Sequence, residues 1–269
     1  MASIALVVEN DAGTRKLLEA MLRRLDLEVD VVAAPASALA LLEAVDYDLV
    51  LLELLFPGSS GSEVLSWLEQ KRPDALQRTI VVSSAPITEL GKVRTQWPSV
   101  RGIQKPFELS DILDIARGVT ASPTRRTGTA FEEFVRRSVR AGARAAVIVA
   151  AGEADAKPVA TFGYRAETID PFLPLALDAD VPICDAMRSR TPVWIASLGP
   201  AAETYPHLVD VWRANESRAL CAIPIIRGDA VIGAVGFSFR EPRMFAESEQ
   251  QAFLALAELA ADVIQTRGE

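Results

Sequence analysis

The stretch 48–61 leaves the first half of this chain few possible folds. It reads Asp-Leu-Val-Leu-Leu-Glu-Leu-Leu-Phe-Pro-Gly-Ser-Ser-Gly, so a Leu- and Val-rich run ends at Glu53 and turn-forming residues follow. A continuous apolar run between such breakers is typical of a strand that is buried on both faces. Open parallel sheets place their functional sites at the carboxyl ends of these strands. We therefore expect Glu53 to present its carboxylate at that edge.

Strand and helix patterns alternate through the first 120 residues. Each apolar run is followed by a segment with apolar residues at helical spacing, as in Leu18, Met21, Leu22 and Leu25. The expected strands cover 4–8, 28–33, 48–53, 79–83 and 100–104, and the expected helices cover 14–25, 37–45, 62–71, 89–96 and 109–119. These five units predict an α/β domain with a five-stranded, doubly wound parallel sheet of the flavodoxin-like type and helices on both faces.

Four motifs at the expected strand ends resemble the receiver domain of two-component response regulators. They are Val-Val-Glu-Asn-Asp at 7–11, the stretch 48–61, Ser-Ser-Ala at 83–85 and Lys-Pro-Phe at 105–107. The resemblance covers residues 1–120. It implies a phosphorylatable aspartate after the third strand, an acidic pair for Mg²⁺ after the first, and a Ser or Thr and a Lys that contact the phosphoryl group. By this resemblance the acidic site is Glu9, Asn10 and Asp11, and the phosphate-contact positions are Ser84 and Lys105.

This sequence departs from the family at the positions that carry the chemistry. Glu53 stands at the phosphoacceptor position, Asn10 replaces one acid, and Gly102 replaces the aromatic residue that reports the phosphorylation state in the family. The extra methylene moves the carboxylate of Glu53 by about 1–1.5 Å, and phosphoryl transfer depends on positioning. The loss of one acid also weakens the attraction for Mg²⁺, so Mg²⁺ binding at Glu9 and Glu53 is expected to be weak or absent.

We therefore expect a pseudo-receiver that is not phosphorylated. In this interpretation Glu53 extends toward Ser84 and Lys105 and partly imitates a phosphorylated aspartate. Two other interpretations stay open. In one, Glu53 only pairs with Lys105 and holds the sheet edge together; in the other, the receiver still accepts phosphate slowly.

A polar segment at 121–129, broken by Pro123 and Gly128, predicts a linker between the first domain and a second domain at 130–267. The second domain is expected to have strands at 143–151, 158–164, 192–195, 218–226 and 230–239, and helices at 130–141, 179–190, 202–214 and 247–265. This order predicts an α+β domain with a central antiparallel sheet. Pro224 after a strand, Gly233 in the next strand and an acidic start to the last helix resemble GAF domains. That resemblance implies a small-molecule sensor or a dimerisation module.

The known GAF chemistries can be compared with the residues present. The Asn-Lys-Phe-Asp-Glu set of cyclic-nucleotide GAF domains is missing, neither cysteine has the adjacent histidine of bilin attachment, and His207 alone is a weak candidate for haem. An unknown small molecule in an apolar pocket remains, although the lining candidates could equally be ordinary core residues. Those candidates are Phe162, Phe172, Trp194, Tyr205, Cys221 and Phe237. A GAF-fold redox enzyme that uses Cys184 and Cys221 is a remote alternative, because both cysteines read as small buried hydrophobes.

Composition and charge narrow the function further. A net charge of −8 over 269 residues argues against binding to nucleic acid. No apolar run is long enough to span a membrane and no signal peptide precedes the first strand, so we expect a cytoplasmic protein. One histidine and two cysteines exclude most metal sites and histidine-based catalysis, and we expect no enzyme activity.

The function expected from the sequence is that of a signalling adaptor that acts through protein contacts. Its partners would be a histidine kinase or a downstream effector, since no helix-turn-helix, kinase core or cyclic-dinucleotide synthase signature is visible. The contact would be made through the fourth and fifth receiver helices or through a GAF homodimer built on the helices at 130–141 and 247–265, although packing of these two helices onto their own sheet is the simpler interpretation. The alternative is a phosphorylatable response regulator with a metabolite-sensing GAF domain.

Overall fold

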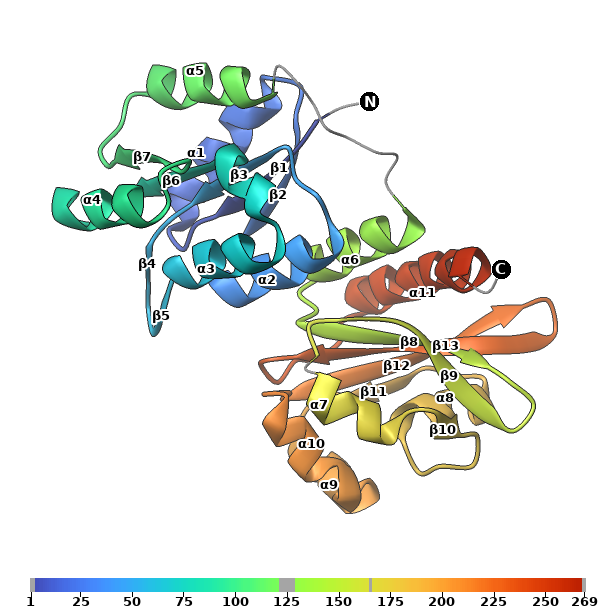
Figure 1. Cartoon of the computed structure of the whole chain (residues 1–269). Coiled ribbons are helices and arrows are strands. Elements are labelled where there is room, and N and C mark those ends of the chain that lie inside the picture. Colours follow the sequence, from blue (N-terminus) through green and yellow to red (C-terminus); the bar gives the residue numbers. More distant parts are fainter. Residues whose placement is uncertain (1–2, 121–128, 165, 268–269) are drawn as a thin grey trace. The chain divides into compact units, whose positions relative to one another are not determined.

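The computed structural model describes residues 3–120, 129–164 and 166–267. The chain forms two compact units, Met1–Thr127 and Gly128–Glu269, each with its own sheet (Figure 1). Of the expected linker at 121–129, residues 121–128 lie outside the described residues. None of the described helices combines the length and the apolar character needed to cross a membrane.

A five-stranded parallel sheet forms the centre of the first unit, with strand order β2-β1-β3-β6-β7. The strands are β1 (Ile4–Val8), β2 (Glu28–Val32), β3 (Leu49–Leu52), β6 (Thr79–Ser83) and β7 (Arg101–Gln104), and the helices are α1 (Ala12–Arg23), α2 (Pro35–Ala44), α3 (Ser62–Lys71), α4 (Ile87–Gln96) and α5 (Leu109–Thr120). This confirms the predicted doubly wound α/β domain. The strand order reverses between β1 and β3, so the carboxyl ends of these two strands border the crevice where such sheets hold their sites.

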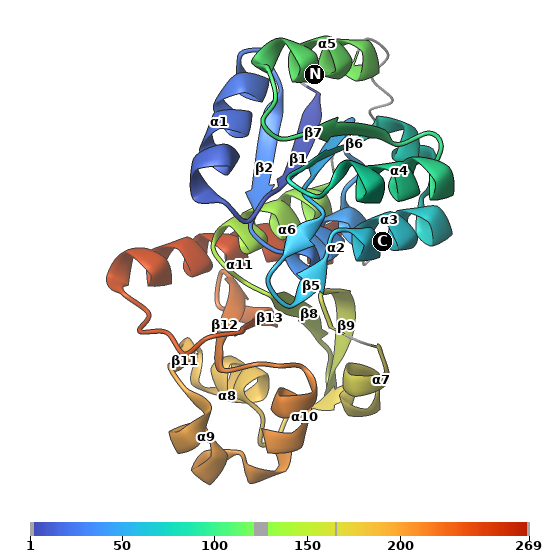
Figure 2. The same ribbon diagram turned by 90° about the vertical axis from the view of Figure 1, so that its left-hand side faces the viewer.

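Helices cover both faces of this sheet. The apolar faces of α1 and α5 pack on one side, where Leu18, Leu22 and Ile112 are fully buried against Val7 and Leu51. Figure 2 shows α3 and α4 on the other side of the sheet from α1. Strands β1 and β3 are buried along their whole length, which explains why their sequences are continuous apolar runs rather than alternating ones.

The chain makes a short hairpin directly after β3, which the sequence did not predict. It consists of β4 (Leu55–Phe56) and β5 (Ser59–Ser60), and Gly58 between them has a left-handed φ of 73°. Gly61 closes the hairpin. A Cβ atom at Gly61 would lie 2.1 Å from the carbonyl oxygen of Glu53, so only glycine lets the returning chain pass here. The hairpin therefore holds the backbone of Glu53 in place.

A six-stranded antiparallel sheet with order β10-β9-β8-β13-β12-β11 forms the second unit. Its strands are β8 (Ala145–Ala151), β9 (Asp155–Phe162), β10 (Leu175–Ala176), β11 (Val193–Ile195), β12 (Ala219–Arg227) and β13 (Ala230–Phe239), and its helices are α6 (Ala130–Arg140), α7 (Ala166–Ile169), α8 (Pro182–Ser189), α9 (Leu198–Thr204), α10 (Val209–Ala214) and α11 (Glu247–Arg267). The predicted α+β class with a central antiparallel sheet is confirmed.

The prediction of one helix over 202–214 is wrong. The chain forms α9, a 3-10 turn η3 (Pro206–Leu208) and then α10. Pro206 is the physical reason, because proline has no N–H for the helical ladder and disfavours helical dihedrals in the residue before it. Tyr205 accordingly leaves the helix, with φ −125° and ψ 61°.

The two faces of the second sheet are covered differently. Helices α6 and α11 lie side by side on one face (Figure 1), and beneath them the ring of Phe237 packs 5.8 Å from that of Phe134 and 5.0 Å from that of Phe253. The segment between β9 and β12 lies on the other face, where α8 contacts β12 and β13. This second face borders an apolar cavity.

Candidate functional site

Glu53 lies at the carboxyl end of β3, as expected, and its carboxylate is buried with a residue exposure of 3%. One oxygen, Oε1, accepts hydrogen bonds from the backbone N–H groups of Leu54 at 2.6 Å and Leu55 at 3.0 Å, and from the hydroxyl of Ser83. The other, Oε2, accepts from the backbone N–H of Ser84 at 3.3 Å. The extra methylene thus lets the side chain fold back over its own backbone.

Lys105 joins Glu53 to the carboxylate at the end of β1. Its ammonium Nζ lies 2.8 Å from Oε2 of Glu53 and 2.6 Å from Oε2 of Glu9, and both glutamates are almost fully buried. The remaining oxygen of Glu9, Oε1, accepts from the backbone N–H of Asp11 at 3.0 Å. One cation therefore bridges two buried carboxylates, which leaves the three side chains with a formal charge of −1.

The pKa values follow from these contacts. Burial raises the pKa of the Glu53 carboxyl, but hydrogen bonds from Lys105, Ser83 and Leu55 outweigh it, and the pKa lies below its ordinary value. Burial lowers the pKa of Lys105, and here Glu53 and Glu9 outweigh it in the opposite direction, so the pKa is raised. Both groups therefore stay charged at neutral pH.

The donor set does not fit the Mg²⁺ that the receiver family implies. Mg²⁺ needs near-octahedral oxygen ligands at about 2.0–2.1 Å, whereas the inward oxygens of Glu9 and Glu53 are both bound to the Lys105 ammonium. Asp11 instead caps helix α1, its Oδ1 accepting from the backbone N–H of Thr14 at 2.7 Å. Asn10 is exposed. Within the described residues no three His, Cys, Asp or Glu side chains gather as metal ligands.

Two further positions named from the sequence lie near this site. The side chain of Ser84 is exposed and the residue reaches Glu53 through its backbone, while the neighbouring Ser83 provides the hydroxyl contact. The sequence interpretation chose between adjacent serines, and strand alternation was the signal that could have favoured Ser83. Gly102 lies in β7, where an added Cβ would meet Leu90 at an ordinary 3.6 Å. The backbone there does not require glycine.

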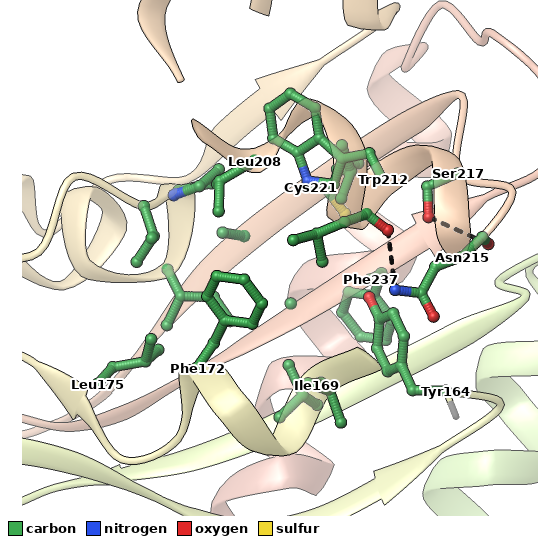
Figure 3. A pocket seen from close by; sticks show the side chains of 18 of the residues that line it. Tyr164, Ile169, Phe172, Leu175, Leu208, Trp212, Asn215, Ser217, Cys221 and Phe237 are labelled. Carbon is green, nitrogen blue, oxygen red and sulfur yellow. Dashed lines mark hydrogen bonds between the residues drawn. The ribbon is translucent and has the colours of Figure 1, made fainter. Parts of the chain in front are cut away.

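The second unit contains a cavity of about 120 Å³ between the sheet and the segment from α7 to α10 (Figure 3). Its walls are mainly aliphatic and aromatic side chains. The lining is made by Val147, Tyr164, Ile169, Phe172, Leu173, Leu175, Val181, Pro182, Ile183, Leu208, Val211, Trp212, Asn215, Ser217, Leu220, Cys221, Ala222, Gly236 and Phe237. Three of the six residues proposed from the sequence are among them: Phe172, Cys221 and Phe237. Cys221 and Phe237 border the cavity from the sheet, in the register row whose Phe237 ring packs against Phe134 and Phe253 on the helix-covered face.

The other three candidates lie elsewhere, and the prediction is wrong for them. Phe162 pairs with Ala146 on the helix-covered face of the sheet, where its ring packs 6.2 Å from Phe134. The ring of Trp194 packs against that of Phe245, with centroids 5.0 Å apart and an interplanar angle of 44°. The hydroxyl of Tyr205 donates to Asp185 at 2.5 Å outside the cavity. Strand register determines the face on which Phe162 and Trp194 lie, and the helix break at Pro206 determines the position of Tyr205.

Polar side chains that the sequence interpretation missed gather at one end of the cavity. Asn215 is buried, its Nδ2 donating to the carbonyl of Val211 at 2.9 Å and its Oδ1 accepting from the hydroxyl of Thr168 at 2.8 Å. The hydroxyl of Tyr164 points toward the Asn215 side chain (Figure 3). Burial raises the pKa of the Tyr164 phenol, so this hydroxyl keeps its proton. Ser217, also buried, lines the same end.

The two cysteines lie on opposite sides of the sheet. Cys184 belongs to the apolar cluster on the cavity side, where its thiol contacts the carbonyl of Ala176 at 3.3 Å. Cys221 shares a register row with Trp194 and Phe237, which alternation turns toward the helix-covered face. Burial raises the pKa of both thiols, most strongly that of Cys221. Neither thiol is activated as a nucleophile.

Comparison with known proteins divides the chain at the same place as the fold does. The profile of the response regulator receiver domain matches residues 5–117, and that of the GAF domain matches residues 125–265. The DNA-binding transcriptional regulator NtrC of Rhizobium meliloti is 27% identical over 122 residues, which is 45% of this chain and 25% of NtrC. The transcriptional regulatory protein ResD of Bacillus subtilis is 36% identical over 67 residues, 25% of this chain and 28% of ResD. The chain thus spans about a quarter of the length of these curated relatives.

Solved structures of both kinds of domain are similar to this chain. The response regulator TrrA of Thermotoga maritima is 24% identical and covers 44% of this chain and 98% of its own, with a TM-score of 0.39. The GAF domain of an Acinetobacter phosphoenolpyruvate-protein phosphotransferase is 13% identical and covers 50% of this chain and 79% of its own, with a TM-score of 0.41.

Proposed function

This chain belongs to the GAF-domain family and carries a response regulator receiver domain ahead of its GAF domain, and on that premise we propose that it is a two-component signalling regulator with a non-phosphorylated receiver. Glu53 holds this receiver near one state, and the chain acts through contacts with signalling proteins rather than through catalysis. The observation that carries the proposal is the Lys105 ammonium, bound between the buried carboxylates of Glu53 and Glu9.

The hydrogen bonds of Glu53 support a receiver that does not react with a phosphodonor. A nucleophilic carboxylate must meet the phosphorus atom in line and at close range. The Oε1 oxygen of Glu53 accepts three hydrogen bonds, and Oε2 is bound to Lys105 and to the backbone of Ser84. Reaction would require the side chain to leave these donors, and no bound Mg²⁺ would compensate, because Lys105 occupies the carboxylate oxygens.

The same contacts support partial imitation of the phosphorylated state. A phosphoryl group on the usual aspartate would carry a charge of about −1.5 to −2. Glu53 offers a single charge, but it engages Lys105 and the backbone of Ser84, the two positions that the family resemblance assigns to phosphoryl contacts, and also the hydroxyl of Ser83. A partner that reads the receiver surface would therefore meet one constant conformation.

A phosphodonor experiment tests this proposal. The full chain is incubated with acetyl phosphate and Mg²⁺, and its intact mass is measured over time. We expect no gain of a phosphoryl group on the wild type. The double variant Glu53→Asp with Asn10→Asp restores the shorter acceptor and the second acid, and it should gain mass under the same conditions. Stoichiometric phosphorylation of the wild type at Glu53 would instead favour a switchable receiver.

We further propose that the GAF domain provides the sensory or dimerising part of the protein. The apolar cavity supports a sensory role, and the pair of helices α6 and α11, which lie side by side on one face of the sheet, supports a dimer contact. A redox activity has little support, because Cys184 and Cys221 lie on opposite faces of the sheet and both thiols have raised pKa values.

A further inference from the structure

The size of the GAF cavity limits what it can hold. Its volume of about 120 Å³ is slightly below that of an engineered apolar cavity of ~150 Å³ that binds benzene. A nucleotide, a bilin or a haem is several times too large for such a space. A molecule built on one six-membered ring fits it.

The charge of the lining limits the ligand further. Among the described residues that line the cavity, none is Asp, Glu, Lys, Arg or His. An ion bound here would lose its hydration without gaining a counter-ion, and such transfer is strongly unfavourable. The ligand must therefore be neutral at the pH of the experiment.

The polar end of the cavity indicates one hydrogen-bonding group on the ligand. Asn215 has one amide proton left after donating to Val211, and one lone pair left after accepting from Thr168. The protonated hydroxyl of Tyr164, which also interacts with Ser238, points toward this amide, and Ser217 lies at the same end (Figure 3). The rest of the wall offers almost only carbon, as Leu175, Ile183 and Phe172 illustrate.

Resting on the sensory role proposed above, we propose that the GAF cavity binds a neutral, single-ring molecule that carries one hydroxyl group. The ring packs against the apolar wall, and the hydroxyl binds between Tyr164 and Asn215. Phe172 is 38% exposed although it lines the cavity, which places the point of entry beside its ring.

Phenol, toluene and benzoate are the probes that test this proposal on the full chain. All three have one ring, but phenol adds a neutral hydroxyl, toluene has no polar group, and benzoate is ionised at pH 7. Affinities are measured by isothermal titration calorimetry and checked by thermal shift, since a ligand that binds only the folded state raises the melting temperature. We expect phenol to bind more tightly than toluene, and benzoate to produce no measurable heat or shift.

Two matched tyrosine variants locate the binding. Tyr164→Phe removes only the hydroxyl at the polar end, so phenol affinity should fall by about two- to tenfold while toluene affinity stays the same. Tyr205→Phe removes the hydroxyl that donates to Asp185 outside the cavity, and it should leave both affinities unchanged. A third variant, Ala222→Leu, adds carbon to the lining and should weaken both ligands.

Three results would overturn the inference. These are benzoate binding as tightly as phenol, no binding of either phenol or toluene, and equal losses of phenol affinity in Tyr164→Phe and Tyr205→Phe. None of these results depends on the phosphodonor experiment on Glu53. Failure of the proposed ligand class can therefore be distinguished from failure of the proposed non-phosphorylated receiver.

Discussion

At the residue scale, one methylene group changes what the receiver site can do. Glu53 reaches the N–H groups of Leu54 and Leu55 with one oxygen and still binds Lys105 with the other. Charge-assisted hydrogen bonds of this kind are among the stronger ones in proteins. The position that normally offers a reactive oxygen is thus used to hold the ends of β3 and β6 together.

The pKa of Glu53 gives a pH-dependent prediction. Because this pKa is lower in the folded protein than in the unfolded chain, the stabilisation by Glu53 is fully present above about pH 5 and is lost as the pH falls through the folded value. In Glu53→Gln we expect the free energy of unfolding to fall by about 1–3 kcal/mol at pH 7. The difference from wild type should shrink below about pH 4. Urea denaturation at a series of pH values measures it.

The matched control for this variant is Glu89→Gln. Glu89 pairs with Lys92 at 2.6 Å on the surface of α4, and such exposed pairs contribute only about 0–1 kcal/mol. A loss in Glu53→Gln no larger than in this control would contradict the role given to the buried contacts.

At the scale of the element, the hairpin β4–β5 after β3 fixes the backbone on which Glu53 stands. The residue that closes it is Gly61, whose Hα faces the Glu53 carbonyl where a methyl group would collide. The geometry of the site thus depends on Gly61, which has no side chain and acts only by letting the backbone pass close to Glu53.

Gly61→Ala tests this dependence. The added methyl would lie 2.1 Å from backbone, so the hairpin must move, and we expect a loss of about 1–3 kcal/mol in the free energy of unfolding. Gly91→Ala in α4 is the matched control, because nothing lies within 4 Å of the added methyl there. Alanine should stabilise that helix by about 0.5–1 kcal/mol. Chemical denaturation measures the free energy of unfolding of both variants. Equal changes in the two would show that the hairpin accommodates the added methyl group at no cost.

The sequence predicted the positions of helices and strands better than it predicted which face of a sheet each side chain occupies. Apolar runs and helical spacing located β1, β3 and α1, because each pattern directly reflects burial of that element. The position of Glu53 beside Lys105 was expected from the resemblance to receiver domains, and the structure shows the two side chains in contact. The cavity wall did not follow, because Phe162 takes its face from its pairing with Ala146, and register is invisible without the partner strand. Tyr164 and Asn215 were missed because they lie just outside regular elements, where no periodicity marks them.

At the scale of the whole molecule, the constant receiver conformation proposed above would leave regulation to the second unit. Its input would be occupancy of the cavity, and its output would be transmitted through α6 and α11. Helix α6 begins at a capping box in which Thr129 and Glu132 bind one another's backbone, so its first turn is well defined. Such a helix is suited to an interface with fixed geometry.

The proposed dimer contact can be tested on the outward face of α11. Ala255 is exposed midway along this helix, so Ala255→Arg would put a charge in the centre of a helical interface without disturbing the buried residues. Sedimentation velocity should show a dimer for the wild type and a shift to monomer for the variant. Gln96→Arg adds the same charge at the end of α4 and should leave the dimer intact. A wild type that sediments as a monomer at high concentration would rule out the dimer.

Gly102 has a practical consequence for studying this protein. Its backbone is ordinary β-strand, and a side chain there would first meet only the methyl group of Leu90 at van der Waals distance. A fluorinated tyrosine installed at this position would therefore serve as a spectroscopic probe. Its resonance would record whether the neighbourhood of Lys105 ever rearranges.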